Sequence, residues 1–296
     1  MLFLIWLSAD VLLTFCYYEV VVNYQETPTL FISICYMMVI AFIVKMGLEV
    51  IGRISEVLVV LVLLITALAL FSLIQDYSPD VFLPMFKDGI AKPAKAGIMN
   101  AVLPFSEIFL AINILPNHND QKKASKVIFL AVLITWSEFS LFTLRNIGVL
   151  GIEVAARTVY PSELVYKLFP GINISFLLNA NVIISGVIKV ALLLYSEVKI
   201  LGDVFGMKDF KIFILPFAAI DIVESVSVHK SNLGQLAFAS TITPLILIPF
   251  LIIMPLIMMT VSLIKKGRHS KADGNKYESD FIDSDDDEDE ESSETC

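Results

Sequence analysis

The sequence predicts an all-α integral membrane protein, a polytopic bundle of about eight helical spans. Of its 296 residues, 57% are hydrophobic, whereas soluble domains are usually about 45–50% apolar. The mean hydropathy is +0.79. The apolar residues come in blocks of roughly 20 residues with few charges, which is the length that crosses a bilayer as a helix.

Eight apolar blocks are long enough to be predicted as spans. They cover about residues 2–22, 27–44, 54–74, 97–115, 127–144, 174–195, 212–228 and 236–264. Polar residues and a proline interrupt the seventh block, and the last holds Pro244, Pro249 and Pro255, which predict a kinked or tilted helix. The first block lacks the basic region and cleavage site of a signal peptide, so we expect it to be retained.

Negative charge is concentrated at the C-terminal end. The last 26 residues hold 12 acids and two lysines and contribute −10, so the other 270 residues sum to +1. Such a low-complexity run cannot bury a core. We therefore predict a transmembrane helical domain, residues 1–264, and a cytoplasmic tail, residues 265–296, that is basic, then acidic, and disordered. The alternative is that the tail docks a basic partner.

Lysines and arginines in the loops predict the orientation of the chain. With the C-terminus in the cytoplasm, the inside segments carry 12 of these residues and the outside segments carry 7. Cytoplasmic loops are enriched in positive charge, so both termini are predicted to be cytoplasmic. Within the second long outside loop, YPSELVYKLF (residues 160–169) has helical spacing of its apolar residues. It is either a short amphipathic helix over the outer mouth or an ordinary structured loop.

Several function classes lack support. The three cysteines and three histidines are scattered and form no disulfide framework or metal spacing. We find no phosphate-binding loop, dinucleotide-binding motif or nucleophile elbow, and no basic surface for nucleic acid. The sequence therefore predicts no catalytic residues, no metal and no cofactor. An intramembrane enzyme could be imagined from Asp10 and Asp221, but neither has a supporting motif.

Polar side chains recur within the apolar blocks on shared helix faces. Ionisable groups inside spans are costly and normally face the bundle interior or a water-filled cavity. The faces are Asp10, Thr14 and Tyr17; Asn100, Pro104 and Glu107; Asn181, Ser185, Lys189 and Ser196; and Asp221 with Glu224. These stripes predict a hydrated or ligand-filled interior. The alternative is that pairs such as Glu107 and Lys189 only neutralise each other, and Glu138 with Arg145 is assigned a structural role.

The fourth block is the strongest candidate for a binding site. Pro104 removes one backbone hydrogen bond and frees the carbonyl of Asn100, and such backbone is tolerated at membrane depth only inside protein or beside a water-filled cavity. Broken helices build the midplane sites of many transporters. A plain proline kink is the alternative, and Glu107 one turn later favours a site. The predicted substrate-binding residues are Asn100, Pro104, Ser106, Glu107, Asn181, Ser185 and Lys189.

Four segments together resemble a known family. They are KMGLEVIGRISEVLVVLVLL (45–64), LPFSEIFLAINILPN (103–117), ARTVYPSELVYKL (156–168) and GVIKVALLLYSEVKILGDVFGMKDFK (186–211). They resemble the spore germination permeases, the B-type subunits of nutrient germinant receptors, in the amino acid–polyamine–organocation transporter superfamily. The resemblance covers about residues 6–264. It implies an inverted five-plus-five repeat in which these eight spans are the family's third to tenth and residues 103–117 belong to the sixth helix, which is discontinuous.

The resemblance also implies a function and partners. The expected protein lies in the spore inner membrane, binds a small nutrient of the amino acid class and triggers germination with an A-type membrane subunit and a C-type lipoprotein. The family's first two helices, including the other discontinuous helix, have no counterpart in this sequence. Either the start of the sequence is misassigned, or the gene is truncated, or the protein works without these helices. The alternative functions are a permease that works by alternating access and a truncated, non-functional paralogue.

Overall fold

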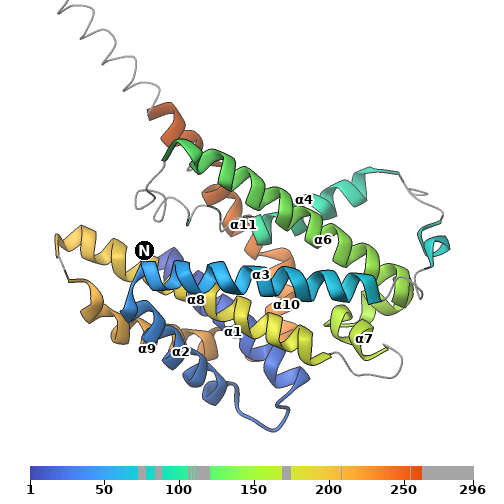
Figure 1. The fold of residues 1–296 in the computed structure, drawn as a ribbon, viewed down its shortest axis with the longest axis horizontal. Coiled ribbons are helices and arrows are strands. Elements are labelled where there is room, and N and C mark those ends of the chain that lie inside the picture. The colour runs from blue at the N-terminus through green and yellow to red at the C-terminus, as the bar shows by residue number, and fades with distance from the viewer. Residues whose placement is uncertain are drawn as a thin grey trace, which may run out of the picture.

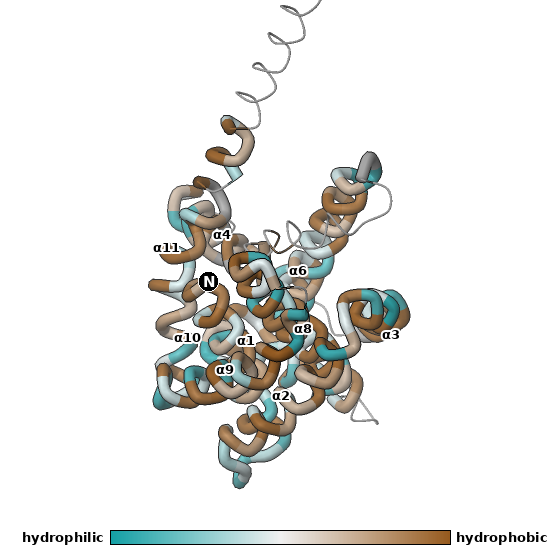
Figure 2. The backbone as a smooth tube through the Cα atoms, turned by 90° about the vertical axis from the view of Figure 1, so that its left-hand side faces the viewer, coloured by the Kyte–Doolittle hydropathy of each residue, from teal (hydrophilic) through white to brown (hydrophobic). Residues whose placement is uncertain are grey.

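The computed structural model describes residues 1–72, 78–83, 89–105, 108, 110, 121–168, 175–207, 209–253 and 255–261. Every regular element within these ranges is a helix, which confirms the predicted all-α class (Figure 1). Five helices in the described part are long and apolar enough to cross a membrane, or six if one bent pair counts as a span. Apolar residues dominate the long helices (Figure 2), so the chain is a multi-pass membrane protein.

Five helices form the main bundle. They are α1 (Leu2–Val22), α2 (Thr29–Met46), α3 (Leu48–Ser72), α8 (Ser175–Phe205) and α9 (Ile214–Val228). Helix α1 packs against α2, α8 and α9, and α3 runs along α8 (Figure 1). Helix α1 carries apolar side chains on every side, with a few polar residues among them, which suits this enclosed place. The fully buried residues of this core include Leu12 and Cys16 of α1, Ile40 and Val44 of α2, and Val190, Leu194 and Val198 of α8.

A second group of helices lies beside this bundle. Helix α4 (Ala91–Phe105) packs against α11 (Thr243–Ile248), and α6 (Gln121–Arg157) contacts α3. The 3-10 turn η2 (Pro79–Phe82) also lies against α6. Large apolar side chains project from α6 along its length, among them Phe129, Trp136 and Phe139. Such a surface is suited to lipid.

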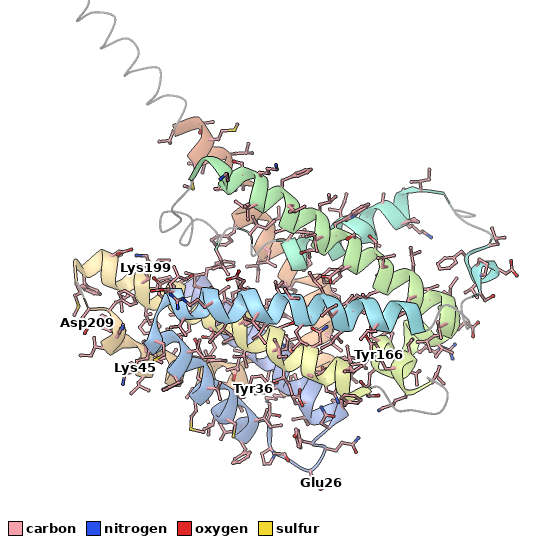
Figure 3. All side chains as sticks on the ribbon, in the orientation of Figure 1. Glu26, Tyr36, Lys45, Tyr166, Lys199 and Asp209 are labelled. Carbon is pink, nitrogen blue, oxygen red and sulfur yellow. The ribbon has the colours of Figure 1, made fainter. Side chains whose placement is uncertain are left out.

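Of the two alternatives for residues 160–169, the structure has the short helix. Helix α7 (Pro161–Lys167) starts with proline at its first position, where the missing N–H costs nothing. Its side chains Glu163, Val165 and Tyr166 are buried against neighbouring helices. Tyr166 lies at one end of the molecule, and Lys45 and Lys199 lie at the opposite end (Figure 3).

The predicted spans differ from the helices mainly at their ends. Helix α8 continues to Phe205, whereas its block was predicted to end at residue 195. The last block is broken, as its prolines predicted, into α10 (Asn232–Thr241), α11 and a π-helical turn (Pro249–Ile253). The chain also bends by 95° between α9 and α10. Residues 106–107, part of the fourth block, and residues 262–296 with the predicted tail lie outside the described residues, so the domain division stays a prediction.

Gly202 lies where α8 touches the segment that leads into α9. A Cβ atom at this position would lie 2.6 Å from the Cβ of Phe210, an atom tied to the backbone. We expect Gly202→Ala to lower the Tm of the protein in nanodiscs, because overpacking costs about 1–3 kcal/mol, against about 1 kcal/mol gained from the better helix former. Gly52→Ala on α3 is the matched control, since nothing lies within 4 Å of that position. Equal changes in Tm would contradict the steric argument.

Candidate functional site

Polar side chains in the bundle gather at three levels along α1 and α8. At the end near α7, Tyr18 and Asn179 meet; we call this the outer network. The middle group consists of Asp10, Thr14, Lys189, His229 and Gln235. The third level is the acidic pair, Glu197 and Asp221, which meets α1 at Ser8. The middle group is the candidate functional site.

Gln235 joins the middle group to α1. Its side-chain nitrogen lies 2.9 Å from the carbonyl oxygen of Asp10, 3.1 Å from the Asp10 carboxylate and 3.0 Å from the hydroxyl oxygen of Thr14, and it donates to these acceptors. Gln235 is buried although it belongs to the first turn of α10. The Oγ of Ser231 caps that helix by accepting from the amide of Gly234. The break after α9 and this cap therefore set the direction in which Gln235 enters the bundle.

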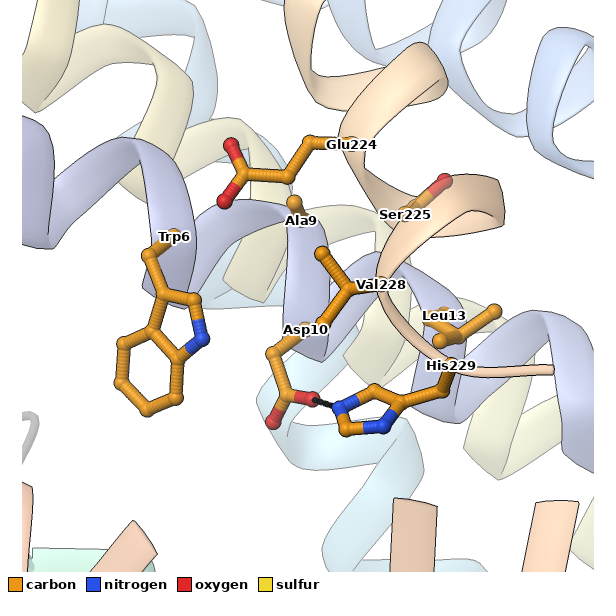
Figure 4. Close-up of a pocket in the computed structure, with 8 residues that line it drawn as sticks. All are labelled: Trp6, Ala9, Asp10, Leu13, Glu224, Ser225, Val228 and His229. Atoms are coloured by element: carbon orange, nitrogen blue, oxygen red, sulfur yellow. Dashed lines mark ion pairs between the residues drawn. The ribbon is translucent and has the colours of Figure 1, made fainter. Parts of the chain in front are cut away.

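A histidine that follows α9 and a lysine of α8 lie near Asp10. The Nε2 of His229, which follows α9, lies 3.5 Å from a carboxylate oxygen of Asp10, within ion-pair distance but without hydrogen-bond geometry (Figure 4). Lys189 of α8 is also close enough to act on this carboxylate through its charge. Tyr17 donates to the carbonyl oxygen of His229 at 2.9 Å. The predicted shared face of Asp10, Thr14 and Tyr17 is confirmed, because all three contact the α9–α10 segment.

A small pocket adjoins this group between α1 and α9. It is lined by Trp6, Ala9, Asp10, Leu13, Glu224, Ser225, Val228 and His229 (Figure 4). The space open to a water-sized molecule is about 10 Å³, which is close to the minimum that holds one water. The pocket in this conformation is therefore too small for an amino acid.

The predicted binding residues are described only in part. On α8, the hydroxyl oxygen of Ser185 lies 3.2 Å from the side-chain oxygen of Asn181, and both residues are half-buried. Lys189 follows one turn later. Asn100 and Pro104 belong to α4, but their side chains are not described, and Ser106 and Glu107 lie outside the described residues. Lys189 thus lies near enough for its charge to act on Asp10, while the role of Asn100, Pro104, Ser106 and Glu107 and the Glu107–Lys189 pairing stay predictions.

The outer network ties α7 to the bundle. Tyr18 donates to the side-chain oxygen of Asn179 at 2.6 Å and lies 3.3 Å from the Glu163 carboxylate. Glu163 also pairs with Lys167 at 3.2 Å. The ring of Tyr160 meets that of Tyr18 edge to face, with centroids 5.1 Å apart. Through these contacts α7 is fixed to both α1 and α8.

Arg145 of α6 anchors the other side of α7. Its guanidinium carbon lies 4.6 Å from the ring centroid of Phe142 and 5.0 Å from that of Tyr166, distances at which a cation is attracted to an aromatic face. It also donates to the side-chain oxygen of Asn146 at 2.8 Å. Asn146 in turn donates to Ser162 at 2.9 Å. These contacts support the structural role predicted for Arg145, whereas Glu138, which was assigned the same role, has a buried oxygen without a hydrogen-bond partner among the described residues.

Several residues of these groups were not predicted from the sequence. Glu197 follows the predicted end of its span, and Gln235 precedes the predicted start of the next. Ser8 and Glu163 lie in stretches whose sequence pattern does not distinguish them from other polar residues. A helical projection extended past the charged end of each apolar block would have placed Glu197 on the helix, because α8 continues regularly through it.

Comparison with known proteins decides the family. Residues 1–233 match the family described as spore germination protein. The chain belongs to this spore germination family. It is also similar to spore germination protein KB of Bacillus subtilis (strain 168), with 26% identity over 286 residues that cover 93% of this chain and 76% of that protein. No solved structure matches.

Family membership makes the chain a germination-related, multi-pass membrane protein, and the family is not a known family of enzymes. The family match spans the whole bundle from α1 to the end of α9 and includes four members of the middle group. Gln235 lies two residues beyond its end. The candidate site therefore belongs to the part of the chain that this spore germination protein shares with its family.

Proposed function

We propose that the chain is the membrane subunit of a spore nutrient-germinant receptor and that it binds a small nutrient of the amino acid class. The observation that supports the proposal is that Lys189 lies near enough for its charge to act on the Asp10 carboxylate inside the bundle. A carboxylate and an ammonium group in one part of the bundle complement the ammonium and carboxylate of a free amino acid. Partly buried charges pair strongly with the charged groups of a ligand when the site excludes water.

Binding must change the conformation of the protein, because the pocket beside Asp10 has room for about one water. The α9–α10 bend supplies an element that can move, since His229 and Gln235 on either side of it both contact Asp10. A nutrient that replaces these contacts would bind an open state better than the closed one. A ligand shifts such an equilibrium only by this difference in affinity.

The residues predicted from the fourth apolar block are proposed to complete the site. Asn100, Pro104, Ser106 and Glu107 are proposed to face α8, where Asn181, Ser185 and Lys189 follow one another along the helix. Lys45 and Lys199 lie at the end of the bundle opposite Tyr166 (Figure 3). This agreement with the loop charges supports an orientation with α7 outside the spore inner membrane and both chain termini in the cytoplasm. The proposed partners are an A-type membrane subunit and a C-type lipoprotein.

A direct binding measurement tests this function. The purified chain in nanodiscs is titrated with each proteinogenic amino acid by calorimetry, and vesicles that contain it are assayed for uptake of any amino acid that binds. We expect saturable binding of one or a few amino acids without sustained accumulation. Accumulation would favour a permease that works by alternating access, for which the 95° break between α9 and α10 is the structural argument. No binding of any amino acid would reject the proposed ligand class.

Glu107→Gln tests the contribution of the fourth apolar block. We expect spores with this substitution to need a higher nutrient concentration for germination, while the protein remains in the membrane at its normal level. The change keeps the size of the side chain and removes its charge, so a lost charge-assisted contact with the nutrient costs roughly 1.5–3 kcal/mol. Dose–response curves and immunoblots of spore membranes are the measurements. An unchanged dose response to every nutrient would leave Glu107 with a structural role only.

A further inference from the structure

A second site lies at the end of the bundle away from α7. Glu197 of α8 and Asp221 of α9 are both fully buried, with 0% of their surface exposed. Ser8 of α1 donates a hydrogen bond to one carboxylate oxygen of Asp221 at 2.8 Å. Helices α8 and α9 pack against each other, and Asp221 lies close enough for its charge to act on Glu197. Three helices therefore converge on two acids and one hydroxyl group.

The carboxylate oxygens at this place have unmet hydrogen-bonding capacity. Both oxygens of Glu197 and the Oδ1 of Asp221 are buried and have no hydrogen-bond partner within the described part of the protein. Glu197 is thus a buried acid without a hydrogen-bond partner among the described residues, near the carboxylate that Ser8 holds. An isolated carboxylate in an apolar interior is strongly unfavourable unless it is neutralised or paired.

The surrounding charges do not neutralise two anions. The groups whose charges act on the pair are Glu224 of α9, which is also acidic, and the amino group of Met1. Lys199, two residues after Glu197, is directed at Asp203 instead, at 3.6 Å. In the described ranges, no lysine, arginine or histidine forms an ion pair with Glu197 or Asp221.

We propose that Glu197 and Asp221 form a proton-binding site in which the two carboxyl groups share one proton. Two carboxylates held close together cannot both remain charged in a buried place, and one shared proton relieves both their repulsion and their cost of burial. The proton also supplies a donor to the oxygens that lack one. The site is separate from the middle group, and it makes the packing of α1, α8 and α9 depend on proton uptake and release.

Infrared spectroscopy of the full chain in nanodiscs tests this directly. A protonated carboxyl group has a carbonyl stretching band that is resolved from the carboxylate bands and shifts in heavy water. At neutral pH we expect this band in the unsubstituted protein and its loss in the double variant E197Q/D221N. In either single variant the remaining acid no longer faces a second charge, so its band should disappear at a pH lower by about one unit or more.

The controls separate this site from other acids and other ligands. Glu49→Gln changes an exposed acid of α3 that pairs with Arg53, and it should leave the band and its pH dependence unchanged. The proposal is overturned if the unsubstituted protein shows no protonated carboxyl band at neutral pH, or if the double variant retains the whole band. It is also overturned if sodium or potassium ions abolish the band at fixed pH, since a cation would then hold the pair. The first and last of these measurements need no substitution and so do not depend on how the variants fold.

Discussion

Asp10→Asn is expected to raise the nutrient concentration needed for germination by roughly ten- to hundredfold, because a hydrogen bond to a charged group contributes about 1.5–3 kcal/mol. Lys189→Gln should have an effect of the same size, since the two residues are proposed to bind opposite ends of one amino acid. The measurements are dose–response curves of spores in which this receptor is the only one. Titration of the purified variants in nanodiscs then shows whether binding is lost.

The competing explanation is that Asp10 and Lys189 only stabilise each other. Removing one charge would then leave the other buried and unpaired, at a cost of about 3–5 kcal/mol, and the protein would disappear from the membrane. The double variant Asp10→Asn/Lys189→Gln distinguishes the two roles, because it leaves neither charge alone. Recovery of both protein level and nutrient response in the double variant would contradict the binding role. Lys199→Gln, which removes a lysine paired with Asp203 outside the site, is the control for loss of positive charge.

The fold class could be predicted because it depends on features repeated along the whole chain. Apolar blocks long enough to cross a bilayer recur, and the structure has helices at these places. Helix ends were harder to predict. The sixth apolar block stops just before the charged residues Glu197, Lys199 and Asp203. Charged residues can end an apolar block without ending the helix. The pair of Lys199 and Asp203, one turn apart, instead supports the last turns of α8.

Only the part of the candidate site that belongs to α1 could be predicted from the sequence. Helical periodicity placed Asp10, Thr14 and Tyr17 on one face of α1, and the structure confirms this face. Its main partner, Gln235, lies 225 residues further along the chain. A single glutamine just before an apolar block carries no signal of its own. Only the bend between α9 and α10, which is a property of the folded chain, brings it to Asp10.

The three polar levels differ in the kind of group that neutralises them. The middle group contains charges of both signs, so it can exchange an internal contact for a contact with a zwitterionic nutrient. The acidic pair contains only negative groups besides Ser8 and therefore suits a proton. The outer network is held by neutral hydrogen bonds and ring contacts around α7, apart from Glu163 and its partner Lys167. Its expected role is to hold the end of the bundle closed.

Tyr166→Ala is expected to release α7 from the bundle. Tyr166 is fully buried, and its ring also faces the guanidinium of Arg145. Replacing a buried aromatic side chain with alanine costs about 3–5 kcal/mol, and here it also removes the cation–π contact. We expect much faster hydrogen exchange over residues 161–167 and a lower Tm in nanodiscs, with little change in the exchange of α2, which does not depend on Tyr166 for its packing.

Tyr166→Phe is the matched control for this change. It keeps the ring against Arg145 and removes only the phenolic oxygen, which is buried and has no hydrogen-bond partner of good geometry among the residues that the structure describes. Its effect on hydrogen exchange and Tm should therefore be small. If α7 exchanges equally slowly in both variants, it is held by the contacts of Glu163 and Tyr160 with Tyr18 rather than by Tyr166. If α7 loosens in Tyr166→Ala and the nutrient response changes with it, the outer network controls access to the middle group.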